Sequence, residues 1–89
     1  MIEVELYYSP YCRGCGPSRR EIRALATAAA DIQFSEWNVL EHIEAAAARG
    51  VRVCPAIVIN GRVVMSGKLS LPRLRAHLHS ANARPGSNL

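Results

Sequence analysis

The amino-acid sequence predicts an α/β domain in which helices flank one mixed four-stranded sheet, with the element order β-α-β-α-β-β-α. Apolar and polar residues alternate, as in strands, in two segments, and the stretch between them has apolar residues at helical spacing. A crossover helix is therefore expected to join two strands that lie parallel. A continuous apolar run at 56–59 is typical of a strand that is buried on both faces. Asn60-Gly61 then joins this run to residues 62–65 as an antiparallel hairpin, which makes the sheet a mixed one.

The first half of the chain contains two predicted strands and one helix. Residues 2–8 alternate apolar and more polar side chains, as expected for a strand with one buried face. A helix is expected from about Pro17 to Ala30, in an alanine-rich stretch of high helix propensity. Its apolar positions recur at helical spacing and are Ile22, Leu25, Ala26 and Ala29. Residues 32–38 alternate again and predict the second strand.

The second half adds two helices around the hairpin. One helix is expected from Leu40 to Arg49, built on Leu40, Ile43 and the alanine run, and ended by Gly50. After the hairpin, Ser70 can cap a final helix. The apolar positions of this helix are Leu71, Leu74 and Leu78. Residues 81–89 have little to bury, so we expect one domain over residues 1–80 and a flexible C-terminal tail over 81–89.

Charge and hydropathy limit the classes of partner. The 89-residue chain carries a formal net charge of +4, which arises mainly from scattered arginines, and its aromatic residues are few. We therefore expect no nucleic-acid partner. No apolar run approaches the ~20 residues that cross a bilayer, and the first residues lack a secretory signal pattern. We expect a cytoplasmic monomer with no membrane partner and no cofactor.

Cys12 and Cys15 follow the first strand and precede the first helix. Two thiols at this spacing can form a small disulfide ring, and three cysteines in a cytoplasmic chain favour redox or metal chemistry over a structural disulfide framework. Free N–H groups at a helix start, together with the charge of Arg13, favour the thiolate of Cys12. We expect Cys12 to attack a substrate disulfide and Cys15 to resolve the mixed disulfide. Half of a zinc site has the same spacing, but no second ligand pair follows.

Two segments carry a resemblance to a known family. Tyr7-Tyr8-Ser9-Pro10-Tyr11-Cys12-Arg13-Gly14-Cys15 resembles the active-site segment of thioredoxin-fold proteins, and Val53-Cys54-Pro55-Ala56 before a hairpin resembles their cis-proline loop. Asn60-Gly61 and Gly67 match small glutaredoxin-like thioredoxins. The resemblance covers about residues 2–80. It implies a thioredoxin-like fold and a thiol–disulfide oxidoreductase of cell redox homeostasis, which carries electrons from an upstream reductase to protein or small-molecule disulfides.

The resemblance also implies roles for residues around the cysteine pair. Pro55 should be cis and should face Cys12, and the backbone of Cys54 should pair with an extended substrate segment. Tyr11 stands where similar thioredoxins carry an aromatic residue, which implies a contact with the partner. Acidic partners would be favoured by the basic residues near the site, which are Arg13, Arg19 and Arg20.

Three departures from the family pattern affect what the resemblance implies. Arg13-Gly14 is neither the Gly-Pro of typical thioredoxins nor the Pro-Tyr of typical glutaredoxins, which leaves the redox potential open. Leu6 stands where similar thioredoxins bury an aspartate for proton transfer. Lys68-Leu69-Ser70 lacks the acidic residue of glutathione-using glutaredoxins, so this pattern disfavours glutathione dependence.

A second alignment of the motif stays open. Cys15-Gly16-Pro17-Ser18 also resembles the thioredoxin Cys-Gly-Pro-Cys motif with serine in place of its second cysteine, and Cys15 would then be the nucleophile of a one-thiol protein. Pro17 suits a first helical turn, which favours this alignment. The connection from strand to cysteine would be longer than the family has, which disfavours it.

Cys54 is open to two interpretations. In the first, Cys54 is a small buried residue that packs as a hydrophobic side chain. In the other, a cis Pro55 brings Cys54 close to Cys12 and Cys15, and three thiols can bind a soft metal ion, a cluster or a sulfur species. A binding protein that uses these three cysteines without turnover is therefore the alternative to the oxidoreductase. A folded adaptor with inactive cysteines is the third hypothesis.

Overall fold

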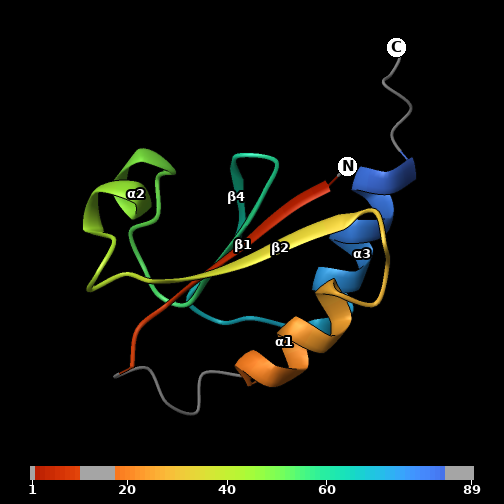
Figure 1. Ribbon diagram of the computed structural model, residues 1–89, viewed down its shortest axis with the longest axis horizontal. Coiled ribbons are helices and arrows are strands. Elements are labelled where there is room, and N and C mark those ends of the chain that lie inside the picture. The colour runs from red at the N-terminus through yellow and green to blue at the C-terminus, as the bar shows by residue number, and fades with distance from the viewer. Residues whose placement is uncertain (1, 11–17, 84–89) are drawn as a thin grey trace.

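The structure, a computed structural model, describes residues 2–10 and 18–83 of the chain (Figure 1). Its elements follow the predicted order β-α-β-α-β-β-α. Their bounds are β1 (Ile2–Tyr8), α1 (Arg19–Ala26), β2 (Ile32–Asn38), α2 (Ile43–Ala48), β3 (Ala56–Ile59), β4 (Arg62–Ser66) and α3 (Leu71–Ala83). None of the helices in these residues is both long and apolar enough to span a membrane.

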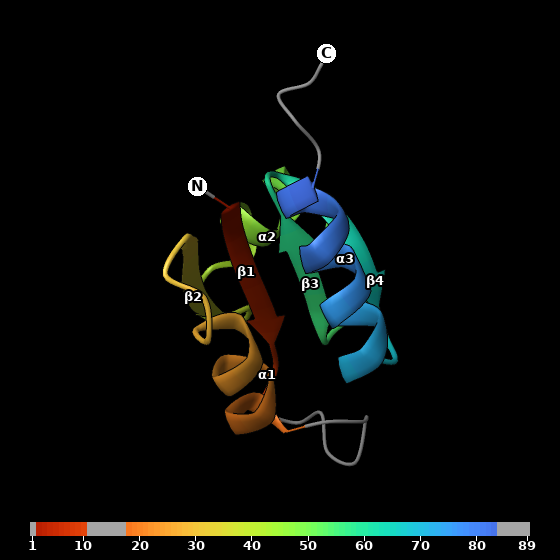
Figure 2. The same cartoon turned by 90° about the vertical axis from the view of Figure 1, so that its right-hand side faces the viewer.

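The four strands form one mixed sheet in the order β2-β1-β3-β4. β1 and β2 are parallel, with Ile2 opposite Ile32 and Tyr8 opposite Asn38. β3 is antiparallel to both β1 and β4. Figure 2 shows α1 and α3 in front of this sheet and α2 behind it. The predicted α/β class, with a parallel first pair and an antiparallel hairpin, is therefore confirmed.

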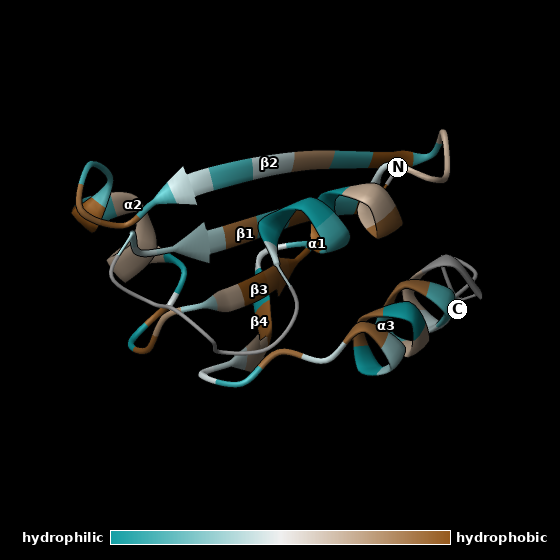
Figure 3. Ribbon diagram, turned by 90° about the horizontal axis from the view of Figure 1, so that it is seen from below, coloured by the Kyte–Doolittle hydropathy of each residue, from teal (hydrophilic) through white to brown (hydrophobic). Residues whose placement is uncertain are grey.

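Alternation along the strands divides the core between the two faces of the sheet. Val4 and Leu6 belong to the cluster under α1 and α3, whereas Tyr7 belongs to the cluster under α2. All of β3 is buried, as its continuous apolar run predicts. Figure 3 shows this contrast, since β3 is largely hydrophobic while hydrophilic and hydrophobic residues alternate along β2.

The hairpin and the last helix have the local chemistry that their sequence predicts. Asn60 and Gly61 have φ values of 51° and 82°, the positive values that a two-residue turn of this kind requires. The Ser70 hydroxyl accepts a hydrogen bond from the Arg73 N–H at 3.3 Å and so caps α3. The helix continues to Ala83, so residues 81–83 are helical and not part of the expected tail, and residues 84–89 lie outside the described ones.

The first helix is shorter than we expected. α1 begins at Arg19 because Ser18 is an extended N-cap, with ψ at 161°. Ser18 and Glu21 form a capping box, in which the serine hydroxyl accepts from the Glu21 N–H at 3.1 Å and the carboxylate accepts from the Ser18 N–H at 2.9 Å. At the other end the helix stops at Ala26, so Ala29 is exposed rather than part of the core.

The second helix is also shorter than the predicted 40–49. Leu40 donates its N–H to the Asn38 side chain at 2.9 Å, and the N–H groups of Glu41 and His42 donate to the Asn38 carbonyl, both at 3.0 Å. These bonds form a turn in place of the first helical turn. Consequently Leu40 and Ile43 are exposed, at 52% and 68%, and the prediction that they build the helix core is wrong. Ala46 is the buried residue of α2.

Candidate active site

One end of the sheet gathers the segments that the sequence marks as functional. β1 and β2 both end there, and the Tyr8 carbonyl accepts the Val39 N–H at 2.9 Å. β3 begins at the same end, because Tyr7 is opposite Ala56 in the antiparallel pair. The chain that leaves β1 and the chain that enters β3 therefore flank each other at this end of the sheet.

The segment that enters β3 has the backbone geometry that the family resemblance implies. The peptide bond between Cys54 and Pro55 is cis. The Pro55 carbonyl accepts the Gly67 N–H at 2.8 Å, which ties this segment to the end of β4. Gly67 has a φ of 82°, in the left-handed region that glycine adopts at little cost. Cys54 and Pro55 are both half-buried.

The other predicted site residues cannot be placed in the same way. Tyr11, Cys12, Arg13 and Cys15 lie outside the described residues. The residues on either side of them are described: β1 ends at Tyr8, and α1 begins after Ser18. The expected approach of Cys12 to Pro55 and the expected partner contact of Tyr11 therefore stay predictions.

The start of α1 is the described feature that bears on the expected Cys12 thiolate. We expected the first helix to begin close to the cysteines, so that its free N–H groups favour the Cys12 thiolate. The described helix α1 begins after Ser18, its extended N-cap. The Ser18 hydroxyl already accepts the Glu21 N–H. Cys12 lies outside the described residues, so the effect of helix N–H groups on its thiol stays a prediction.

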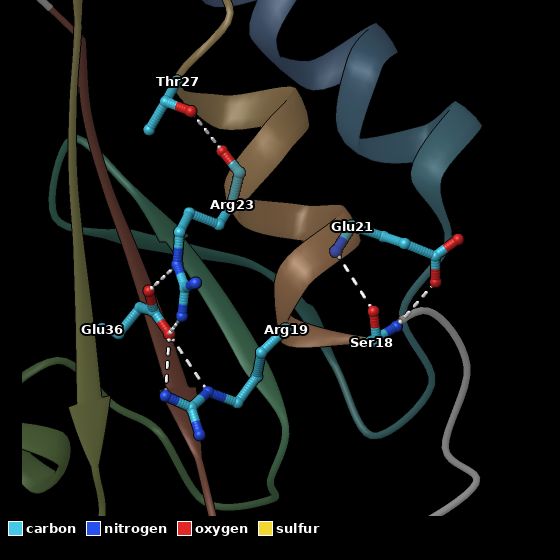
Figure 4. A network of polar contacts seen from close by, with 6 residues as sticks. All are labelled: Ser18, Arg19, Glu21, Arg23, Thr27 and Glu36. Atoms are coloured by element: carbon cyan, nitrogen blue, oxygen red, sulfur yellow. Dashed lines mark hydrogen bonds and ion pairs between the residues drawn. The ribbon is translucent and has the colours of Figure 1, made fainter.

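A charge network that we did not predict lies beside the end of β1 (Figure 4). Glu36 on β2 accepts hydrogen bonds from Arg19 Nε at 3.1 Å and from Arg23 Nε at 2.5 Å and Nη2 at 3.0 Å. Arg19 also places its guanidinium 3.8 Å from the centroid of the Tyr8 ring, a cation–π contact. The network therefore joins α1, β2 and the last residue of β1.

Electrostatics in this network favour the charged form of Glu36. Its pKa lies below the ordinary value of 4.5, mainly because Arg23 donates a hydrogen bond to it, and Arg19 acts in the same direction. Partial burial opposes this effect. The Glu36 side chain is only 17% exposed, whereas the two arginine side chains are about half exposed. Solvent screening therefore limits the energy of these pairs.

The lowered pKa of Glu36 predicts a pH-dependent part of the stability. Because the folded value is depressed, the stabilisation is present above about pH 4.5 and is lost as the pH falls through the folded value. We expect Glu36→Gln to lower the free energy of unfolding at pH 6 by about 0.5–1 kcal/mol. In urea unfolding between pH 6 and pH 3, the difference from wild type should shrink toward zero.

Glu41→Gln provides the control for this measurement. Glu41 is exposed, and its side chain forms no hydrogen bond or ion pair with any residue in the described ranges. The free energy of unfolding of the Glu41→Gln variant should therefore follow the wild-type curve across the same pH range. A constant difference between wild type and Glu36→Gln down to pH 3 would contradict the role of the Glu36 charge.

A second polar cluster holds α2 against the opposite face of the sheet. The Tyr7 hydroxyl donates to Glu5 Oε1 at 3.1 Å, and Arg49 at the end of α2 donates to the same atom at 3.0 Å. Burial, followed by the Glu5 charge, raises the pKa of Tyr7. The Trp37 ring stacks on Tyr7 with centroids 6.0 Å apart and meets His42 edge-on at 4.9 Å. This cluster is structural, since it fixes the short α2 near the ends of β1 and β2.

Burial raises the pKa of the Cys54 thiol. This thiol therefore stays protonated at neutral pH, which makes it a poor nucleophile and a metal ligand only when the metal displaces its proton. Among the described residues, no three His, Cys, Asp or Glu side chains form a group that could hold a metal ion. The soft-metal hypothesis also needs Cys12 and Cys15, which lie outside these residues.

The strand order, the helices on both faces and the cis bond before β3 define a thioredoxin-like α/β domain. A thioredoxin-domain family model matches residues 2–78. A thioredoxin from Methanocaldococcus jannaschii is 34% identical over 67 residues, which are 74% of this chain and 79% of that protein. The chain therefore belongs to the thioredoxin family.

Solved structures agree with this assignment at the level of the fold. A thioredoxin of Malassezia sympodialis superposes with a TM-score of 0.69 at 20% identity, over 92% of this chain and 76% of that one. A designed protein gives the same TM-score at 22% identity and covers 92% of this chain and 81% of its own. The family and the fold together make this a thioredoxin-like redox protein.

Proposed function

We propose that the protein is a thiol–disulfide oxidoreductase whose working pair is Cys12 and Cys15. The observation that carries the proposal is the family match over residues 2–78, which spans both the Cys12–Cys15 motif and the Cys54–Pro55 segment. The sheet register supports it, because the chain leaving β1 toward Cys12 and the chain entering β3 from Pro55 lie at one end of the sheet.

The proposed reaction conserves electrons in two exchanges. The Cys12 thiolate attacks one sulfur of a substrate disulfide, forms a mixed disulfide, and releases the second substrate sulfur as a thiolate that takes a proton from water. The Cys15 thiol then loses its proton and attacks the Cys12 sulfur, which releases the first substrate sulfur as a thiolate. The substrate has gained two electrons, and the protein holds a Cys12–Cys15 disulfide. An upstream reductase returns two electrons to regenerate the dithiol.

Residues around the pair would bind the substrate rather than react with it. We infer from the family resemblance that the backbone of Cys54 pairs with an extended substrate segment beside Pro55, and that Tyr11 and Arg13 contact the partner. The raised pKa of Cys54 supports a binding role for its backbone, since the protonated thiol does not compete with Cys12 for the substrate disulfide.

The electron donor is proposed to be a protein reductase rather than glutathione. Ser70, in the stretch where glutathione-using glutaredoxins carry an acidic residue, uses its hydroxyl to cap α3. Leu69 is buried, and Lys68 is exposed and basic, so no carboxylate is present in this stretch for the amino group of glutathione. We further propose that the protein acts as a monomer in the cytoplasm, on protein or small-molecule disulfides.

Insulin reduction by dithiothreitol tests the proposed function directly. We expect the wild-type protein to speed the precipitation of reduced insulin chains in a dose-dependent way, and Cys12→Ser to reduce this rate to that of dithiothreitol alone. A metal or sulfur-species binding protein, or an adaptor with inactive cysteines, would not increase the rate. Full activity of Cys12→Ser would contradict the assigned nucleophile.

A further inference from the structure

The two flanks of the segment that carries the cysteines are joined by one side chain. Tyr8 is the last residue of β1, and Arg19 is the first residue of α1. The Arg19 guanidinium carbon lies 3.8 Å from the centroid of the Tyr8 ring. The two flanks of residues 9–18 are thus in contact with each other, although they belong to different elements.

A third element holds the arginine in this position. Glu36 Oε1 on β2 accepts a hydrogen bond from Arg19 Nε at 3.1 Å and forms an ion pair with Arg19 Nη2 at 3.0 Å. The edge of the guanidinium is therefore bonded while its face covers the ring. A planar guanidinium can donate from its edge while its face stacks on the ring, whereas an ammonium group has neither a flat face nor a fixed fork of donors. Glu36 is in turn bonded by Arg23, one helical turn further along α1. Figure 4 shows both arginines converging on this carboxylate.

We propose that Arg19 is a positioning residue for the Cys12–Cys15 pair, because it ties the end of β1 to the start of α1 through Tyr8 and Glu36. This inference rests on the proposed function, which gives the pair its redox role. Holding both flanks of a segment removes conformations in which its ends are far apart, and so favours reactions that close a ring within it. The reaction concerned is the formation of the Cys12–Cys15 disulfide.

The test measures this ring closure against glutathione as a redox buffer. Cys12 and Cys15 lose two protons and two electrons to oxidised glutathione, which gives the protein disulfide and two molecules of glutathione thiol. We expect Arg19→Met to lower the equilibrium constant of this reaction about threefold, with about tenfold as the upper bound that the usual strength of a cation–π contact and an ion pair sets. Only the part of that strength that differs between the dithiol and the disulfide form shifts the constant. A tenfold change corresponds to about 30 mV in the reduction potential.

Four matched variants separate positioning from charge and from stability. Arg20→Met removes the same charge one residue further on, from an exposed side chain that bonds no described residue, and should change the constant less than twofold. Arg23→Met loses the bond to Glu36 but leaves the Tyr8 contact, and should also change it less than twofold. Tyr8→Leu and Arg19→Lys, which keep the charge, should each reproduce the effect of Arg19→Met.

The result that would overturn the inference is distinct from failure of the proposed function. Equal shifts in Arg19→Met and Arg20→Met would show that charge alone acts, and no shift in either would show that the contact has no role. A shift in Arg23→Met as large as that in Arg19→Met would assign the effect to lost stability. A wild-type protein that forms no Cys12–Cys15 disulfide in the glutathione buffer would overturn the proposed function, and this inference with it.

Discussion

The Cys15→Ser variant is expected to accumulate a stable mixed disulfide between Cys12 and a substrate sulfur. In the wild-type protein the Cys15 thiol releases the substrate from Cys12. Serine has a similar size but its hydroxyl cannot attack the mixed disulfide, so the first exchange proceeds and the second stops. With an excess of a disulfide-containing peptide, mass spectrometry should show close to one peptide per chain. The rate of insulin reduction should fall to that of dithiothreitol alone.

The same experiment decides between the two alignments of the motif. If Cys12 is the nucleophile, Cys12→Ser should form no such adduct at neutral pH. If Cys15 is the nucleophile of a one-thiol protein, Cys12→Ser would retain the adduct on Cys15, and Cys15→Ser would lose it. That second pattern would contradict the proposed roles. The thioredoxin family assignment would be unaffected, because it rests on the match over residues 2–78.

Leu6→Ala is expected to have the largest effect on stability. Leu6 is 1% exposed, lies on a central strand opposite Ile57, and belongs to the core under α1 and α3. Truncation of a buried leucine costs about 2–5 kcal/mol through lost burial and the cavity that remains. A domain of this size has a total stability of only about 5–15 kcal/mol. Urea unfolding should show a midpoint well below that of wild type.

Leu40→Ala is the matched control for this substitution. It removes the same atoms from a side chain that is 52% exposed in the turn before α2. We expect a change of less than about 0.5 kcal/mol. A loss as large as that of Leu6→Ala would mean that Leu40 is buried and that the longer helix predicted from the sequence is the correct one.

Most of the fold could be predicted from the sequence because local signals and burial agree. Alternation identified β1 and β2, the apolar run identified β3, and Asn60-Gly61 identified the hairpin. The predicted start of α1, at about Pro17, was wrong by a short distance. The pattern Ser18-Arg19-Arg20-Glu21 is that of a capping box and would have located the true start. Helical spacing alone could not do so, because it does not mark where a helix begins.

The second helix shows a different reason for failure. Leu40 and Ile43 fit a helical pattern, but periodicity gives no information about whether a neighbouring element covers the apolar side. Here Ala46 is the buried residue of α2 and belongs to the cluster of Tyr7, Ala56 and Val58. The length of this helix depends on Asn38, whose side chain and carbonyl bind the three N–H groups that follow it.

The candidate site was predictable in part. The cis bond at Pro55 agrees with what two short motifs implied. The contact between Arg19, Tyr8 and Glu36 was not predictable, because it depends on the parallel register and on how α1 crosses β2. These residues are distant in the sequence, and no single motif contains all three of them.

The central claim is that Cys12 is the reactive thiol of this protein, and competitive alkylation tests it most directly. The reduced wild-type protein is treated with limiting iodoacetamide at pH 7, and the modified cysteine is identified by peptide mass spectrometry over time. We predict that Cys12 is modified first and that Cys54, whose pKa is raised by burial, is modified last. Faster modification of Cys15 or Cys54 than of Cys12 would contradict the claim.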